Sequence, residues 1–309
     1  MNTFVAQLRR EIWEHPVFYI APIVIGGLLF GLTGLMLIGD AGSAQGIQII
    51  TRDFELTDAR YGDAGMTIAL MSFVPAFVLP LIVIIGFYVL DSLSTERRDG
   101  SILFFKSLPV SDTMTVLSKF VTASVVAPAL TLAALIVTQL AVLALATVAF
   151  LLGDSGVAML WNVSRIVSVW TLAAYGVVAF GLWFAPIHCY FLAVSAWARR
   201  ATFVWAASPL LLIFVERAFT GRSLLGQLLA AYVGGFLSTA FAHRFQVAIG
   251  DDEEVSEALE HADLEAMETV WGWMDPVGLI TSPALWAGLL IAAGFATVAV
   301  MSRRYRDDS

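Results

Sequence analysis

Residues Tyr88–Phe120 read YVLDSLSTERRDGSILFFKSLPVSDTMTVLSKF, and this segment separates two long apolar runs of the chain. It contains Lys106 and Lys119, the only two lysines in the sequence. Apolar runs of this length are typical of membrane spans, so the charged segment between them is a connector outside the lipid. A membrane protein that concentrates charge in one short connector usually presents that connector to a partner, which makes it a candidate binding segment.

The composition predicts an all-α membrane protein that forms a single domain over residues 1–309. Hydrophobic residues make up 59% of the chain and charged residues 14%, whereas ordinary soluble domains are about half apolar and a quarter charged. A spanning helix needs roughly 20 apolar residues. Six transmembrane helices are expected, with the fifth short, at Val17–Ile38, Thr67–Leu90, Phe120–Leu152, Ser168–Ala196, Thr202–Phe214 and Pro283–Met301. The third and fourth exceed the length of a span and are expected to tilt, to project beyond the lipid, or to kink at Pro128 or Pro186.

The basic residues predict the orientation of the six spans. With six spans, the two termini, the connector and the Arg199-Arg200 turn lie on one side, and most of the 17 basic residues fall there. Cytoplasmic loops are enriched in Lys and Arg, so both termini and the connector are expected in the cytoplasm. The outer loop 215–282 is then acidic, with Asp251–Glu254 as its densest run. We interpret this run as a solvated helix face, with a cation-binding or partner-binding role as the alternative. The net charge of −8 argues against nucleic acid as a partner.

Two segments outside the spans are expected to lie at the membrane surface. Phe4–Trp13 is amphipathic and is predicted to form an elbow helix that His15-Pro16 ends, although an ordinary helix flank is equally consistent. Ser223–Phe241 is apolar but contains glycines and a glutamine. If it spanned the membrane, the C-terminal arginines would move outside, so a pair of re-entrant or interfacial helices on the outer side is expected.

The sequence predicts no catalytic, metal or cofactor site in this chain. It has no H-E-x-x-H pattern, and Gly100–Ser107 fails as a nucleotide-binding loop because Phe105 stands where a second glycine is needed. The His188-Cys189 pair inside the fourth span is interpreted as a packing contact, since no acidic residue is adjacent. Carboxylates are absent from the centres of the expected spans, which weakens the case for an ion-coupled carrier.

Gly27 and Gly31 form a G-x-x-x-G pattern within the first span. Small residues at this spacing let two helix backbones approach closely. The pattern makes these glycines a candidate packing face for a dimer.

The connector resembles the segment between the second and third spans of ABC-2 type transporter permeases. The residues that carry the resemblance are Glu96-Arg97, Gly100-Ser101-Ile102-Leu103, Ser107-Leu108-Pro109-Val110-Ser111 and Lys119. Asp112 departs from the family, in which a basic residue is common at this place. The expected elbow helix, six spans and cytoplasmic ends agree with the same family over the whole chain.

The resemblance implies that the chain is the permease subunit of a bacterial ABC exporter in the inner (cytoplasmic) membrane. Its partners would be a cytoplasmic ABC ATPase subunit, a second permease copy in a homodimer or heterodimer, and membrane lipid. ATP and magnesium would be bound by the ATPase, and this chain would hold no cofactor and perform no bond chemistry. A cytoplasmic coupling helix would dock on the ATPase through Glu96, Arg97, Arg98, Asp99, Gly100, Ile102, Leu103, Phe104, Phe105 and Lys106.

The residues of the connector suit an interface, since an apolar centre at Ile102–Phe105 is flanked by charges. Pro109 would end the coupling helix. The alternative for this segment is a helix whose phenylalanines enter the membrane surface. The alternatives for the whole chain are a stand-alone secondary transporter or channel, and an intramembrane enzyme.

Overall fold

A computed structural model of the protein describes residues 3–40, 67, 69–98, 111–152, 157–198, 200–242 and 270–305. These residues are helical apart from short connections and form no strand, and an isolated bridge pairs Phe241 with Met274. Within the described ranges, five helices are long and apolar enough to cross a membrane. They cover Val17–Leu37, Ala69–Glu96, Asp112–Leu151, Val163–Trp183 and Pro283–Tyr305. Over the described residues, the prediction of an all-α protein with several helices long and apolar enough to span a membrane is therefore confirmed.

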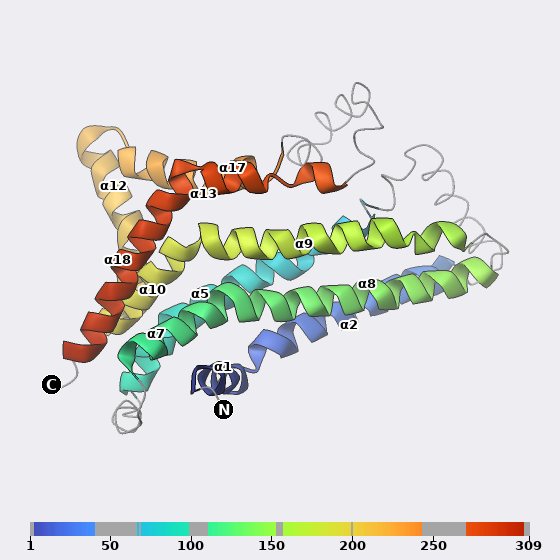
Figure 1. The fold of residues 1–309 in the computed structure, drawn as a ribbon, viewed down its shortest axis with the longest axis horizontal. Helices are drawn as coiled ribbons and strands as arrows, with labels where there is room; N and C mark the ends of the chain where they lie inside the picture. The colour runs from blue at the N-terminus through green and yellow to red at the C-terminus, as the bar shows by residue number, and fades with distance from the viewer. Residues whose placement is uncertain are drawn as a thin grey trace.

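The helices form an elongated bundle (Figure 1). Their bounds are α1 Thr3–Glu14, α2 Val17–Asp40, α5 Val74–Arg98, α7 Asp112–Val121, η1 Thr122–Val126, α8 Ala127–Leu152, η2 Ala158–Trp161, α9 Val163–Trp183, α10 Ala185–Trp197, α11 Thr202–Ala206, α12 Ser208–Thr220, α13 Leu224–Ala240, η3 Val270–Trp273, α17 Pro276–Thr281 and α18 Pro283–Tyr305. Figure 1 shows α2, α5, α8 and α9 running along the long axis, and α10 packs along α18. Both ends of the chain lie at the end of the bundle occupied by α1 and α7 (Figure 1).

The main core joins α2, α5, α7, η1, α8, α10 and α18 near that end. Phe18 of α2, Ile85 and Val89 of α5, Leu192 of α10 and Ala299 of α18 are each buried in it. Because α18 comes last in the chain and α2 comes near its start, burial of this core holds the two ends of the chain together.

The third span contains a π-helical turn at η1, directly before Pro128. Proline has no N–H, so the carbonyl of Ser124 four residues earlier loses its helical partner, and such defects widen a helix. Helix α9 packs closely against this π-helical turn. A Cβ at Gly181 would lie 2.6 Å from the Ser124 carbonyl oxygen, so only glycine allows this approach. The Ser124 hydroxyl also lies 2.9 Å from His188 Nδ1.

The fourth expected span is divided at Phe184, between α9 and α10. Pro186 lies in the first turn of α10, where its missing N–H has no helical partner to lose. The prediction of a kink near Pro186 is thus confirmed, and the third span is irregular beside Pro128. The π-helical turn η1 and the end of α9 meet at the close approach of Gly181 to Ser124.

The fifth expected span, Thr202–Phe214, is divided between the short helices α11 and α12. Gly221 then adopts φ 68°, a left-handed conformation that ends α12 and that glycine adopts without strain. The Glu216 carboxylate accepts the backbone N–H groups of Leu224 and Leu225 and so fixes the start of α13. At 17 residues, α13 is at the lower limit of the length that a full span requires. The count of six spans and the re-entrant character of this region stay predictions, and the acidic run Asp251–Glu254 lies outside the described residues.

Candidate functional site

Charged side chains gather in the interior where α1, α5, α7 and α18 meet. Glu11 is 2% exposed, Glu96 6%, Lys119 1% and Arg303 5%. Burial of charged groups is costly unless each is paired, so such a group of residues indicates a specific structural or functional role. We call these four residues together with Asp112 the ion-pair cluster.

Lys119 of α7 is the centre of the cluster. Its Nζ lies 3.0 Å from Glu11 Oε1 on α1 and 3.0 Å from Glu96 Oε1 on α5. The contact with Glu11 is also a hydrogen bond. One ammonium group therefore ties the N-terminal helix to the end of the second span.

Arg303 of α18 extends the cluster to the last helix. Its Nη1 donates to Glu96 Oε2 at 2.5 Å, and its Nε donates to Asp112 Oδ1 at 2.9 Å. Glu96 lies near the end of α5 and Asp112 begins α7, so the two acceptors flank residues 97–111, the part of the connector to which the word refers from here on. The Arg303 guanidinium thus holds both ends of the connector against α18.

Local sequence explains how these groups reach one another. The Ser111 hydroxyl accepts the backbone N–H of Met114 and caps α7, which fixes where this helix begins. Asp112 and Lys119 are seven residues apart, two turns along α7, and so share one face of the helix. On α5, Tyr88 precedes Glu96 by eight residues and lies on the same side, where its hydroxyl donates to Glu11 Oε2 at 2.8 Å.

The end of α1 is held against this cluster by a second set of contacts. His15 lies edge-on to Tyr88 and Phe18, with its Nε2 3.9 Å from Glu11 Oε2. Burial lowers the pKa of His15 below its ordinary value, although Glu11 partly opposes this change. For Arg10, burial acts to lower the pKa, but Glu14, Glu11 and Glu96 outweigh it and the pKa is raised. Arg10 therefore stays charged and supplies a third cation, 3.8 Å from Glu96.

The arrangement is suited to holding helices together. Among the described residues, Glu11, Glu14 and His15 are grouped closely enough to hold a metal ion. Both carboxylates already form ion pairs, Glu11 with Lys119 and Glu14 with Arg10 at 2.6 Å. The charged side chains of this site are therefore paired with one another.

Three of the ten residues assigned to ATPase docking lie within the described residues. Glu96 is inside the ion-pair cluster, where its carboxylate contacts Lys119 and Arg303. Arg97 and Arg98 form the last turn of α5. The other assigned residues, Asp99, Gly100, Ile102, Leu103, Phe104, Phe105 and Lys106, lie outside the described residues.

The glycines assigned to dimer packing lie on an open face of α2. Among the described residues, nothing lies within 4 Å of a Cβ placed at Gly27 or Gly31. Ile23 and Leu28, on the same helix, are well exposed. No described part of the chain covers this face, and dimer packing stays a prediction.

Comparison of the chain with models of known protein families, with curated proteins and with solved structures found no match.

Proposed function

We propose that the chain is the permease subunit of an ATP-driven ABC-2 type exporter. It spans a bacterial inner membrane six times with both termini in the cytoplasm, and α1 is its elbow helix. Two permease copies form the translocation pathway. A separate ATPase subunit binds ATP and Mg²⁺ and docks on the connector between Glu96 and Asp112.

The observation that carries this proposal is the attachment of both ends of the connector to other helices. Arg303 bonds to Glu96 on one side of the connector and to Asp112 on the other. Lys119 links the same Glu96 to Glu11 of α1. A displacement applied to the connector would therefore move α1, α5, α7 and α18 together, as a mechanical input to a transport pathway requires.

The composition of the connector agrees with docking to a soluble partner. Ile102–Phe105 supply an apolar centre, and charged residues flank it on both sides. Interfaces commonly bury an apolar centre within a polar rim. In this proposal Phe104 and Phe105 insert into a groove of the ATPase, and the buried Glu96 anchors the start of the docking segment.

Co-purification tests the proposal. The full chain is co-expressed with the nucleotide-binding protein encoded beside it, and retention of that protein is measured after extraction in detergent. Retention with ATP hydrolysis supports the permease function. If the wild-type chain retains no ATPase, or if it transports a solute alone in proteoliposomes, the proposal is wrong.

A pair of matched variants tests the docking segment separately. Phe104→Asp with Phe105→Asp is expected to abolish retention of the ATPase while membrane insertion is unchanged, because two carboxylates cannot enter an apolar groove without losing their hydration. Phe104→Leu with Phe105→Leu keeps the segment apolar and is expected to retain the ATPase. Equal retention by both double variants would contradict docking through these residues.

A further inference from the structure

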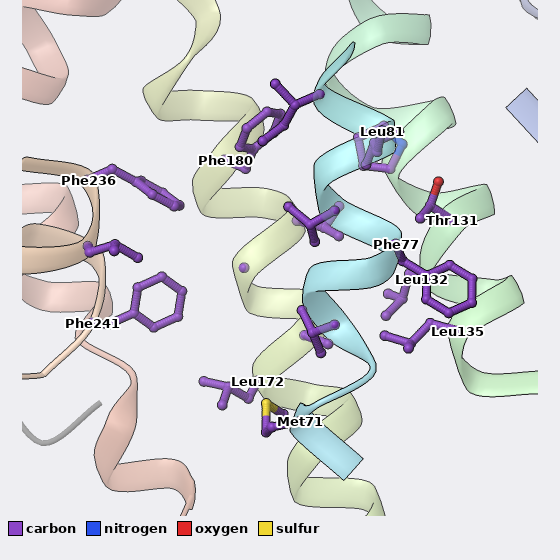
Figure 2. Close-up of a pocket in the computed structure, with 18 residues that line it drawn as sticks. Met71, Phe77, Leu81, Thr131, Leu132, Leu135, Leu172, Phe180, Phe236 and Phe241 are labelled. Carbon is purple, nitrogen blue, oxygen red and sulfur yellow. The ribbon is translucent and has the colours of Figure 1, made fainter. Parts of the chain in front are cut away.

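A cavity of about 200 Å³ lies between α5, α8, α9 and α13, and no residue of the ion-pair cluster lines it. Figure 2 shows Phe77 and Leu81 on one side of it, Leu132 and Leu135 beside them, and Phe180, Phe236 and Phe241 opposite. Every described lining residue is apolar except Thr131, whose buried hydroxyl has no hydrogen-bond partner among the described residues. The cavity therefore offers a ligand apolar contact on all sides and a single hydroxyl group.

The wall formed by α13 is fixed by hydrogen bonds between helices. The Trp183 indole donates to the Tyr232 carbonyl at 2.9 Å, and the Tyr232 hydroxyl donates to the Trp183 carbonyl at 2.6 Å. At the end of α13, the Tyr175 hydroxyl donates to the Ala240 carbonyl at 2.7 Å. The cavity is therefore preformed, because its wall is held by contacts that do not depend on an occupant.

The cavity has a buried floor and an exposed mouth. On the floor, Phe77 is 1% exposed and Leu172 is 2% exposed. At the mouth, Val78 is 37%, Ile82 45% and Leu237 39% exposed. Val78 and Ile82 belong to a helix that is long and apolar enough to cross a membrane, so their exposed sides face lipid. The mouth therefore opens sideways into the bilayer.

We propose that this cavity binds one hydrocarbon chain of an amphiphile, which enters from the bilayer and leaves its polar head outside. Apolar cavities remain dry and accept apolar ligands, and one of about 150 Å³ is large enough for benzene. At about 200 Å³, this cavity is larger than one that holds benzene, and lipid hydrocarbon surrounds its mouth. The proposal requires only that the helices lie in a bilayer, so it does not depend on the permease function.

Gly176 provides a way to fill the cavity from within. It lies on α9 in the lining, and a Cβ there would meet only Phe241 Cζ, at 3.7 Å. This is an ordinary contact distance, so the helix accepts a side chain, and the rest of a leucine would occupy the cavity. Gly294 on α18 is an exposed glycine outside the lining, and no described residue lies within 4 Å of its Cβ position, so it serves as the matched control.

Photochemical labelling tests the proposal. The full chain is reconstituted in nanodiscs of phosphatidylcholine that carries a diazirine near the end of one acyl chain, and labelled residues are mapped by mass spectrometry. A second sample contains a diazirine fatty acid at low mole fraction, with unlabelled fatty acid as competitor. The wild-type chain is expected to be labelled on the floor of the cavity, at Phe77 and Leu172. Gly176→Leu should reduce this labelling roughly tenfold, since its side chain takes space that the hydrocarbon needs, and Gly294→Leu should not change it.

Labelling of the floor by the phospholipid identifies a bilayer lipid as the occupant, whereas saturable labelling by the fatty acid alone identifies a single-chain amphiphile. The proposal is overturned if neither probe labels the floor, or if labelling of the floor survives Gly176→Leu. Ala173→Leu, also in the lining, replaces Gly176→Leu if that variant does not fold.

Discussion

Replacement of Arg303 by methionine tests whether the ion-pair cluster holds the end of the bundle together. The variant removes the cation that bonds to Glu96 at 2.5 Å and to Asp112 at 2.9 Å. Breaking a buried ion pair by removing one partner typically costs about 3–5 kcal/mol, because the other charge is left buried. Glu96 keeps its contact with Lys119, and the Asp112 side chain is 27% exposed, so water compensates part of the loss. The lower end, about 3 kcal/mol of unfolding free energy, is therefore expected.

The assay is thermal unfolding of the purified full chain in one detergent. A loss of about 3 kcal/mol corresponds to a fall in Tm of roughly 6 °C for a chain of this size. Arg304 is the matched control, because it is the next residue on α18 and is exposed, with its guanidinium 5.6 Å from the Tyr305 ring. Arg304→Met should shift Tm by less than about 2 °C, in line with surface substitutions.

A double-mutant cycle connects the loss to the contact itself. Glu96→Gln and Arg303→Met are combined, and the double variant should lose about 1–2 kcal/mol less than the sum of the two single losses. Equal shifts in Tm for Arg303→Met and Arg304→Met would refute the argument, as would additive losses in the cycle.

Three further predictions concern neighbouring contacts. Gly181→Ala should lower Tm strongly, because its Cβ would lie 2.6 Å from a backbone carbonyl oxygen, whereas Gly294→Ala in open space should not; equal Tm values would contradict this close approach. Tyr88→Phe should cost about 1.5–3 kcal/mol of unfolding free energy, since the Glu11 carboxylate loses a buried hydrogen bond, and a loss below about 0.5 kcal/mol would contradict it. The lowered pKa of His15 means that the unfolded chain binds a proton at a higher pH than the folded chain. Acidification below about pH 6.5 should therefore lower the Tm of the wild type more than that of His15→Gln, and parallel pH profiles would contradict this.

Several features of the fold follow directly from local sequence. Five apolar runs of spanning length correspond to long helices, because burying twenty apolar residues in a bilayer outweighs other local preferences. Helix α1 ends at Glu14, immediately before His15-Pro16, as the restriction that proline places on the preceding residue predicts. The irregular places in the third and fourth spans lie beside Pro128 and Pro186 for a similar reason.

The ion-pair cluster was not predicted, because its partners are far apart in the chain. Glu11 and Lys119 are 108 residues apart, and Glu96 and Arg303 are 207 apart. Sequence analysis assigned Glu96 to the docking surface and Lys119 to a family motif, without pairing either residue. A local signal was present, since Asp112 and Lys119 share one face of α7 and Lys119 is followed directly by an apolar run. That signal marks a charge that needs a partner, but it does not identify the partner.

The cost of burying these charges suggests that they fix the relative positions of the helices more than they add stability. Replacing a whole buried ion pair by apolar residues is often neutral or stabilising, whereas removing one partner is destabilising. Glu11→Leu with Lys119→Met should therefore restore much of the unfolding free energy that Lys119→Met alone loses.

The position of α1 on α7 can be measured separately by cross-linking. Thr3 Oγ1 lies 3.8 Å from Met114 Sδ, and the chain's one cysteine, Cys189, is buried. Cysteines introduced at Thr3 and Met114 should form a disulfide efficiently in an otherwise wild-type chain. They should do so less efficiently in the apolar double variant, since apolar contacts alone allow α1 to slide. If the disulfide yield is unchanged while stability is restored, the cluster does not set the position of α1, and the transfer of movement from the connector to α1 has to depend on the apolar core instead.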